Sequence, residues 1–117
     1  MNVRDIRAAL WTLRALRVVN EALPDGRWEG LEFPRVPRSR NSSEWAVEAV
    51  LRQRGATCLA AAIVRQTWLA AHGSPRDLVI GVTAPARGFT AHAWLSGDDP
   101  CHNAEYTELL RRPIGER

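Results

Sequence analysis

One cysteine in this sequence is placed where it could act as a nucleophile. Cys58 follows Gly55-Ala56-Thr57 at the predicted start of a helix. The first turn of a helix offers unpaired N–H groups and the positive end of the helix dipole, and both stabilise a thiolate. The same N–H groups could hold the oxyanion of a tetrahedral intermediate. The alternative is that Cys58 is a small buried core residue, as free cysteines often are.

A histidine further along the chain could serve as the base for that cysteine. His92 lies in a predicted strand, where alternation puts His92 and Trp94 on one face and Ala91 and Ala93 on the other. The small neighbours leave room for another group to approach the imidazole. A helix-initial cysteine followed by a strand histidine is typical of papain-like Cys-His enzymes, in which the helix N-terminus packs against the sheet. Taken alone, His92 would be interpreted as a hydrogen-bonded structural histidine.

The elements that must position this pair are predicted from hydrophobic periodicity and from turn residues. We expect helices over residues 3–23, from Ser43 as N-cap to Gly55, and from about 56–58 to 72. Strands are expected over 78–82, 89–95 and 101–106, with a hairpin turn at 96–100 and a short helical turn at 107–112. This order predicts an α+β fold in which N-terminal helices pack on a small antiparallel sheet, as a papain/transglutaminase-like core.

Two N-terminal segments carry apolar residues whose role must be predicted. On the first helix the apolar residues recur at three- and four-residue steps, which predicts a stripe packed on the core, with partner docking as the alternative. That stripe consists of Val3, Ile6, Leu10, Leu13 and Leu16. The loop at 24–43 contains Trp28, Leu31 and Phe33, and we expect it to cover the core or to form one wall of a groove. We predict a single domain over 1–117, with helix and loop at 1–43 and a catalytic core at 44–117.

Composition excludes several classes of protein. The chain has 117 residues, 45% hydrophobic and 25% charged, as in ordinary globular proteins, and no apolar run long enough for a membrane span. Arg14 and Arg17 interrupt the segment that a signal peptide would need to be apolar, so we expect a cytoplasmic protein without a membrane partner. All 16 basic residues are Arg and the net charge is +3. Because these arginines are dispersed, we expect a solvated surface and no nucleic-acid partner, with a modest attraction to an acidic peptide as the open alternative.

Metal binding is the other chemistry that the cysteines could support. The chain has two cysteines, and Cys101 is followed directly by His102. Adjacent residues of a strand point to opposite faces, which argues against a zinc site formed by Cys58, His92, Cys101 and His102. The same position, beside a turn, argues against Cys101 as the nucleophile. We therefore expect neither a metal nor a cofactor.

Three segments together resemble a known family. The runs Gly55–Leu59, Leu78–Val82 and Ala91–Leu95 look like those of the transglutaminase-like leader peptidases of lasso peptide biosynthesis, and Glu108–Pro113 is similar to the end of stand-alone members. The resemblance covers roughly residues 45–113. It implies a cysteine peptidase that removes the leader peptide from a ribosomally made precursor. It also implies a separate leader-recognition protein as partner and an ATP-dependent macrolactam cyclase that acts next.

The resemblance assigns Cys58 as nucleophile and His92 as general base and acid, but the third catalytic residue departs from the family pattern. That pattern has an Asp about twelve residues after the His, where this chain has alanine. If a hairpin turns at Asp98-Asp99, Glu105 falls opposite His92 and could orient the imidazole. A shifted turn would bring Asn103 instead, and Asp98 is expected to form the turn. A dyad oriented by a backbone carbonyl is the remaining alternative.

The predicted reaction is acyl transfer through a covalent intermediate. His92 takes the thiol proton, Cys58 attacks the scissile carbonyl, His92 protonates the leaving amine, and water releases the acyl-enzyme. Two other functions stay open: a non-catalytic docking module of a peptide-maturation complex on the same fold, and acyl transfer to an amine.

Overall fold

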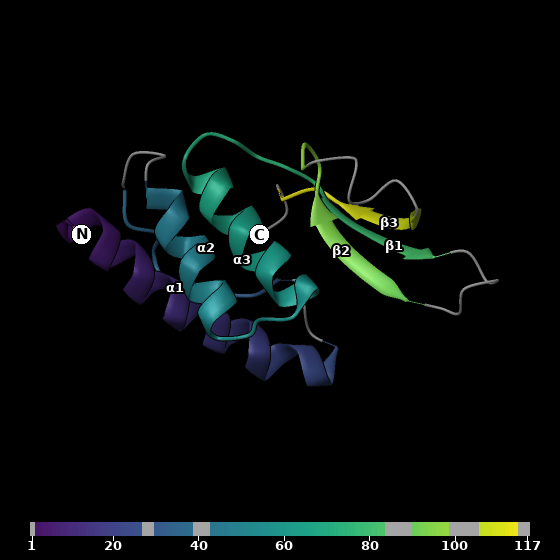
Figure 1. The fold of residues 1–117 in the computed structure, drawn as a ribbon, viewed down its shortest axis with the longest axis horizontal. Coiled ribbons are helices and arrows are strands. Elements are labelled where there is room, and N and C mark those ends of the chain that lie inside the picture. Colours follow the sequence, from purple (N-terminus) through teal and green to yellow (C-terminus); the bar gives the residue numbers. More distant parts are fainter. Residues whose placement is uncertain (1, 27–29, 39–42, 84–89, 99–105, 115–117) are drawn as a thin grey trace.

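The computed structural model describes residues 2–26, 30–38, 43–83, 90–98 and 106–114. Three helices come first and three strands follow, which confirms the predicted α+β fold (Figure 1). The helices are α1 (Val3–Ala22), with a 3-10 turn at Leu23–Asp25, α2 (Glu44–Gln53) and α3 (Cys58–Ala71). The strands are β1 (Leu78–Thr83), β2 (Ala91–Leu95) and β3 (Tyr106–Arg112).

The ends of the first two helices are closed by short-range polar contacts. Asn2 and Asp5 form a capping box at the start of α1, with Asp5 N–H donating to Asn2 Oδ1 at 3.0 Å. Ser43 occupies the N-cap position of α2, but its hydroxyl makes no cap bond and donates instead to Asp5 Oδ1 at 3.1 Å. Gly55, the second residue after α2, adopts φ +64°, as expected of a residue that ends a helix. Asp5 therefore ties the starts of α1 and α2 together.

The face of α1 that packs on the core differs from the predicted stripe. Of the predicted residues only Leu16 is buried, whereas Val3, Ile6 and Leu10 are exposed and Leu13 is half-buried. The buried face includes Ala8, Trp11, Thr12, Ala15, Leu16, Val19 and Ala22. Its alanines have small side chains, so α1 can lie close to its neighbours, and larger residues fill the space between them. The prediction was wrong because α1 carries two apolar faces, and the buried one combines small alanines with larger residues such as Trp11.

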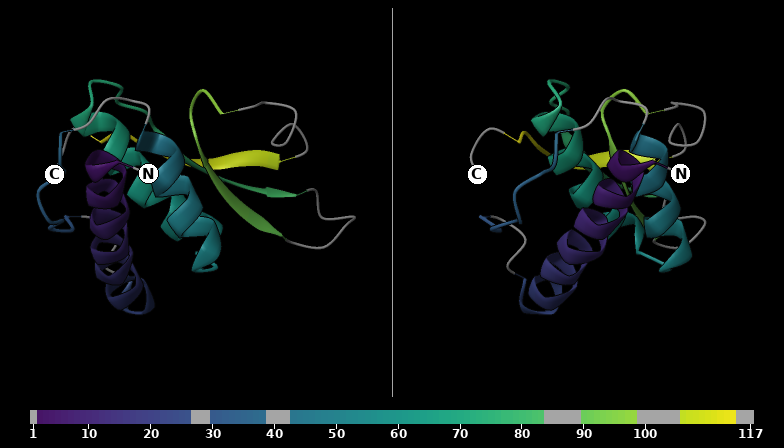
Figure 2. Two further views of the ribbon diagram at one scale, coloured as in Figure 1. Left: turned by 60° about the vertical axis from the view of Figure 1, so that its left-hand side comes forward. Right: turned by 90° about the vertical axis from the view of Figure 1, so that its left-hand side faces the viewer.

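The core lies between the helices and one face of the sheet. In two views at different angles, α3 lies next to the sheet and α1 on the side away from it (Figures 1 and 2). Leu78 of β1 and Ala93 and Leu95 of β2 are buried in the same cluster as Ile63 and Trp68 of α3. This packing sets α3 against β2, the strand that carries His92.

The loop after α1 lies where the sequence predicted. Leu31, Phe33 and Val36 pack against the core, and the Trp11 indole N–H donates to the Pro34 carbonyl at 3.0 Å. With residues near the end of α3 they line an open groove, so this loop both covers the core and forms a groove wall. Trp28 lies outside the described residues. No helix in the described segments is both long and apolar enough to cross a bilayer.

The third described strand shares only Tyr106 with the third predicted strand. The sheet has the order β2-β1-β3, so β3 pairs with β1 and not with β2. The helical turn predicted over 107–112 is wrong, because Tyr106–Arg112 is β3 itself. Leu, Glu and Arg favour helix locally, but this segment pairs with β1 and thereby satisfies backbone groups that would otherwise lie at a sheet edge. The predicted hairpin turn at 96–100 leads into a strand over 101–106, and residues 99–105 lie outside the described residues.

Candidate functional site

Cys58 is the first residue of α3, as predicted. Thr57 at the N-cap is extended, with ψ 160°, and its hydroxyl accepts the Ala60 N–H at 3.2 Å. The Thr57 carbonyl accepts the Ala61 N–H at 2.9 Å, which closes the first helical turn. The local sequence explains this start, because Gly55 ends α2 and threonine is a strong N-cap residue.

The thiol of Cys58 is exposed, so the alternative of a buried core cysteine is wrong. The N–H groups of Cys58 and Leu59 belong to the first turn, where an α-helix has no internal acceptor for them. Neither N–H donates to an acceptor in the described part of the chain. An exposed sulfur therefore lies beside two N–H groups that can still bind an anion.

His92 lies on β2, an edge strand, with Gly81 of β1 as its pairing partner. The predicted alternation is confirmed: Ala93 and Leu95 are buried among the core residues, and His92 and Trp94 lie half-buried on the other face. The imidazole stacks on the Trp94 ring at 5.7 Å between centroids and lies 5.1 Å from the ring of Tyr106. Two aromatic rings therefore hold the imidazole from neighbouring positions on the same face.

Gly81 makes this aromatic cluster possible. A Cβ at position 81 would lie 2.8 Å from Trp94 Cη2 and 2.9 Å from the Thr107 carbonyl oxygen, and real Cβ atoms do not approach so closely. The absent side chain lets the Trp94 ring lie across β1 towards Tyr106, whose ring centroid is 6.1 Å away. Residues of β2 and β3 thus meet over the central strand although these two strands do not pair.

The two tryptophans considered in the sequence have different roles. The sequence favours core or partly buried scaffold for both Trp68 and Trp94, with the lining of a substrate groove as the alternative. Trp68 is buried in the core and stacks on His72 at 4.3 Å and against Trp11 at 5.4 Å. Trp94 lies half-buried beside His92 on the sheet face away from the core. Trp94 is therefore available to contact a substrate.

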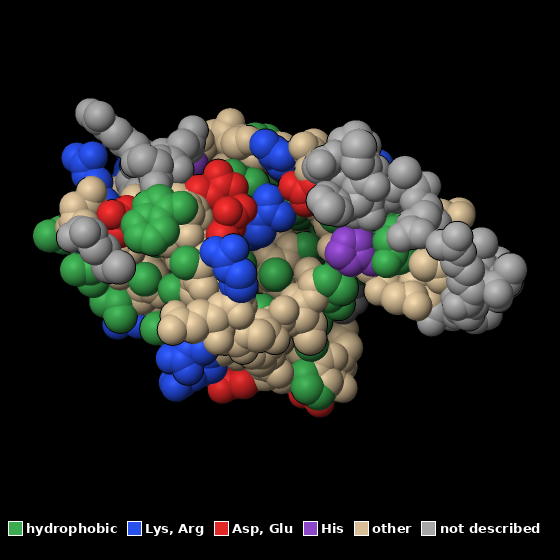
Figure 3. Space-filling view, viewed as in Figure 1, with side chains coloured by type: hydrophobic (Ala, Val, Ile, Leu, Met, Phe, Trp, Pro, Cys, Tyr) green, Lys and Arg blue, Asp and Glu red, His purple; other side chains and the backbone are tan. Residues whose placement is uncertain are grey.

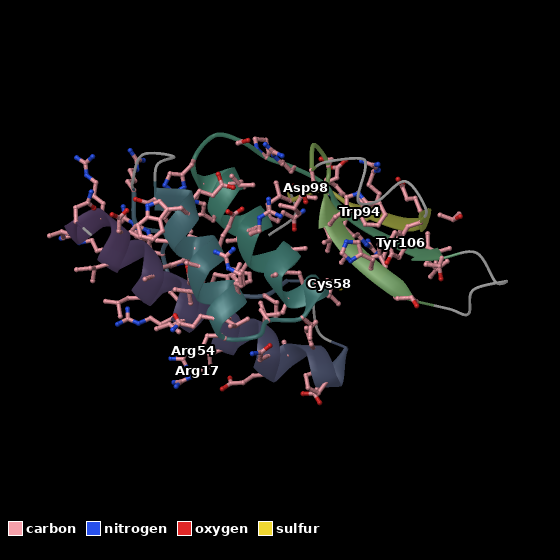
Figure 4. The ribbon with its side chains drawn as sticks, viewed as in Figure 1. Arg17, Arg54, Cys58, Trp94, Asp98 and Tyr106 are labelled. Atoms are coloured by element: carbon pink, nitrogen blue, oxygen red, sulfur yellow. The ribbon has the colours of Figure 1, made fainter. Side chains whose placement is uncertain are left out.

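The structure brings the elements of the predicted pair together without a hydrogen bond between the two side chains. α3 packs against β2, and Figure 4 shows Cys58 at the start of α3 beside that strand, with Trp94 and Tyr106 over the adjoining sheet. Within the described residues no hydrogen bond joins Cys58 Sγ to His92. Catalytic hydrogen bonds are often long before substrate binds and tighten in the complex.

No described residue that could serve as the third catalytic residue contacts His92. Glu105 and Asn103 lie outside the described residues, as do Cys101 and His102. The register that would place Glu105 opposite His92 therefore stays a prediction, and the described strand that follows, β3, pairs with β1. Glu108 pairs with Gly81 from the β3 side, but its carboxylate accepts hydrogen bonds from Arg111 at 2.7 and 3.1 Å.

Asp98 forms the turn after β2, as expected. Its carboxylate accepts two hydrogen bonds from Arg65, at 3.1 and 3.2 Å, and the Leu95 N–H at 3.0 Å. Burial acts to raise the pKa of Asp98, but the hydrogen bonds from Arg65 and Leu95 outweigh it, so the pKa lies below its ordinary value. Asp98 is therefore held as a carboxylate by α3 and by its own turn.

Arg65 is a positioning residue that sequence reasoning missed. Its side chain is only 21% exposed, and desolvation acts to lower its pKa, yet ion pairs keep that pKa above the ordinary value. Its partners are Asp98 and, at 3.6 Å, Glu48 of α2. Arg65 thus joins α3, α2 and the turn after β2, and it fixes the helix that carries Cys58 relative to the strand that carries His92. No local sequence signal marks such a residue, because its partners are distant in the chain.

Tyr106 is a second residue of the site that sequence reasoning missed. It was predicted only as the end of a strand, whereas its ring lies against His92 and near Trp94. An aromatic residue on a strand is a weak signal, and only the strand order places it here. Among the described residues no cluster of three or more metal-ligating side chains occurs.

Comparison with known proteins identifies a family for the chain. No curated protein and no solved structure shows significant similarity to the chain. A family profile described as the Transglutaminase-like superfamily matches residues 2–111, which is nearly the whole chain. This superfamily includes cysteine proteases and acyl transferases. The chain therefore belongs to the transglutaminase-like superfamily.

Proposed function

We propose that this protein is a cysteine peptidase in which Cys58 is the nucleophile and His92 the general base and acid. The observation that carries the proposal is the exposed thiol at the first residue of a capped helix, on a helix that packs against the strand of His92. Membership in a superfamily that includes cysteine proteases supports it. The reaction takes place within a single domain over residues 1–117, and it requires no metal and no cofactor.

The proposed reaction has two halves. His92 accepts the proton of the Cys58 thiol, and the sulfur adds to the scissile carbonyl to form a tetrahedral oxyanion. The N–H groups of Cys58 and Leu59 bind this oxyanion while the C–N bond breaks, and His92 gives its proton to the departing amine. Water, deprotonated by His92, then attacks the thioester, and the carboxylate product and the free thiol are released.

The orientation of His92 during this cycle depends on its neighbours. Trp94 and Tyr106 contact the imidazole from the same sheet face and limit its rotation, so both act as positioning residues. For the polar group that fixes the imidazole tautomer we propose Glu105, with Asn103 as the second candidate. Asp98 is occupied by Arg65 and Leu95, which makes it a poor third candidate.

The proposed substrate is the leader region of a ribosomally made lasso peptide precursor. The support for it is the resemblance of the segments around Cys58, Gly81 and His92 to the leader peptidases of lasso peptide biosynthesis. The leader is presented by a separate recognition protein, and a macrolactam cyclase takes over the released core peptide. We propose that the reaction takes place in the cytoplasm, where a free thiol stays reduced.

A cleavage assay with mass spectrometry tests the proposal. The purified chain is incubated with a lasso precursor peptide, with and without its recognition protein, and the masses of the products are measured. We expect two fragments from hydrolysis of one peptide bond, and a thioester adduct on Cys58 in rapidly quenched samples. Cys58→Ala and His92→Ala should produce neither, whereas Cys101→Ser, which changes the other cysteine, should retain cleavage.

Two outcomes would contradict the proposal. Full cleavage by Cys58→Ala would exclude the thiol as nucleophile. Binding of the precursor without cleavage, unchanged in Cys58→Ala, would indicate the docking module instead. Addition of a primary amine distinguishes the third function, because an amide product in place of the acid would indicate acyl transfer rather than hydrolysis.

A further inference from the structure

The exposed face of α1 carries an apolar line that the core does not use. Val3, Ile6 and Leu10 are 64%, 46% and 49% exposed, and half-buried Leu13 continues the line towards Arg17. We call these five residues the α1 seam. Figure 3 shows hydrophobic side chains gathered over the N-terminal half of α1 and the start of α2, where Trp45 is 49% exposed. The opposite side of α1 is buried in the core, so α1 cannot turn to hide the seam.

The spacing of the seam is that of a coiled coil. Its residues succeed one another at steps of three, four, three and four, which makes Val3, Leu10 and Arg17 the a positions and Ile6 and Leu13 the d positions of heptads. A stripe restricted to a and d positions is the narrow surface that one further helix covers. An ordinary core-facing stripe is wider, and α1 already has one.

The charged side chains at the e positions within the seam are both arginines. Arg7 and Arg14 occupy the e positions of these heptads, and with Arg17 and Arg54 they form no ion pair within the described residues. Arg17 of α1 and Arg54, directly after α2, are exposed and line one open hollow of about 540 Å³ (Figure 4). The apolar part of its lining is Leu13 and Leu16, and its acid is Glu21.

From the spacing and the charges together we propose that the α1 seam docks an amphipathic helix of a partner protein, apolar at its own a and d positions and acidic at the flanking positions. The acidic flanks would face Arg7 and Arg14, and one acidic side chain would enter the hollow between Arg17 and Arg54. Opposite charges at such flanks set partner choice and orientation in helix pairs. The proposal concerns α1 and holds whether or not Cys58 is a nucleophile.

Other occupants fit the seam less well. In a parallel pair of two copies, Arg17 would oppose itself inside the seam, and in an antiparallel pair the arginines at the e positions would face each other. A membrane surface favours a broad apolar face with basic residues at its borders. The seam is narrow, and Arg17 lies on the apolar line itself.

A pair of designed peptides tests the proposal. Each has about three heptads, with Ile at a and Leu at d. One carries Glu at every e and g position and the other carries Lys, so neither pairs with itself. Binding of the fluorescently labelled peptides to the whole chain is measured by anisotropy at several salt concentrations. We expect the Glu peptide to bind at least about tenfold tighter than the Lys peptide, with a preference that decreases as salt rises.

Variants of the chain decide whether the seam is the binding surface. Ile6→Ser with Leu10→Ser should weaken the Glu peptide by at least about tenfold. Arg7→Glu with Arg14→Glu should reverse the preference towards the Lys peptide. Arg35→Glu is the matched control, because it changes an exposed arginine next to Pro34, on the side of α1 where Trp11 is buried. Circular dichroism and thermal midpoints establish that each variant folds.

Four results would overturn the proposal. The first is equal binding of the two peptides, or no binding tighter than about 1 mM by either. The second is binding that the seam variants leave unchanged. The third is self-association of the chain in sedimentation experiments that Ile6→Ser with Leu10→Ser abolishes, which would identify a second copy as the occupant. The fourth is seam-dependent binding to phosphatidylcholine–phosphatidylserine vesicles, which would identify a membrane surface.

Discussion

α1 and α3 each begin after a polar residue whose side chain accepts a hydrogen bond from the first turn. At α1, Asn2 accepts the Asp5 N–H, and the Asp5 carboxylate accepts both the Asn2 N–H at 3.2 Å and the Ser43 hydroxyl. At α3, Thr57 accepts the Ala60 N–H, while the next residue is an exposed cysteine. The same cap bond therefore begins both helices, and in both the first two backbone N–H groups have no partner in the described residues. We call the start of α1 closed because Asp5 binds it to its cap and to α2, and the start of α3 open because an exposed thiol follows its cap.

The two helix starts differ in the residues just after the cap. In α1 the third residue is an acid that returns to the cap and then binds α2, so the end of the helix is part of the scaffold. In α3 no acid occurs in the first turn, and the N–H groups of Cys58 and Leu59 have no partner in the described residues. A helix start becomes a candidate reaction site when its polar groups are left for a ligand. The comparison therefore separates residues that hold the fold from residues that perform the chemistry.

The largest expected effect is on the open helix start. Cys58→Ala should lower the cleavage rate by at least about 10³-fold, because no other group supplies the nucleophile. The free energy of unfolding should change by less than about 0.5 kcal/mol, because the thiol is exposed. Single-turnover cleavage and urea unfolding measure the two quantities. If Cys58→Ala lost activity and also unfolded far more readily than the wild type, the loss of activity would follow from a structural role of Cys58.

At the closed start of α1, we expect a substitution to lower the stability and to leave the cleavage rate unchanged. Asp5→Ala removes the acceptor of the buried Ser43 hydroxyl and half of the capping box. We expect a loss of about 1–3 kcal/mol in the free energy of unfolding. At a temperature where the variant is folded, its cleavage rate should equal that of the wild type, and Asp5→Asn should recover part of the stability. A rate reduced as strongly as in Cys58→Ala would break the comparison.

The cap of α3 should show both effects on a smaller scale. Thr57→Ala frees the Ala60 N–H and should cost about 1 kcal/mol of stability. A frayed first turn also displaces the sulfur and its two N–H groups, so we expect a cleavage rate about tenfold lower. Thr57→Ser keeps a hydroxyl acceptor and is the matched control, and it should restore both quantities. Unchanged cleavage in Thr57→Ala would separate the helix start from the reaction.

The smallest expected effect is the dependence of stability on acid pH through Asp98. Its pKa is lowered in the folded protein, so its contribution is present above the unfolded pKa of about 3.9 and is lost as the pH falls through the folded value. We expect a contribution of about 1 kcal/mol, since the carboxylate is partly exposed and screened by solvent. Unfolding of wild type and Asp98→Asn between pH 7 and pH 2 measures it. If the free energy of unfolding changed with pH in the same way in both proteins, the Arg65–Asp98 pair would not contribute to the pH dependence of stability.

Local signals in the sequence determined the start of α3 and the strand that carries His92. Gly55 and Thr57 are an end signal and a cap within three positions, so the placement of Cys58 at the start of α3 needed no distant contact. Strand alternation around His92 was equally local, and burial of Ala93 and Leu95 confirms it. The order of helices and then strands was predicted from the same kind of signal, because the hydrophobic periodicity of a helix or strand is a property of its own residues.

Other features depend on contacts between distant residues. Tyr106 reaches His92 because β3 pairs with the free side of β1 and Gly81 leaves space between them, and neither the pairing nor the space is a local property. The choice between the two apolar faces of α1 was likewise made by packing. The face with Ala8 and Ala15 packs closely against its neighbours and leaves the larger residues Ile6 and Leu10 in solvent. Periodicity specifies that a helix has an apolar face, but only the shape of its neighbours decides which face is buried.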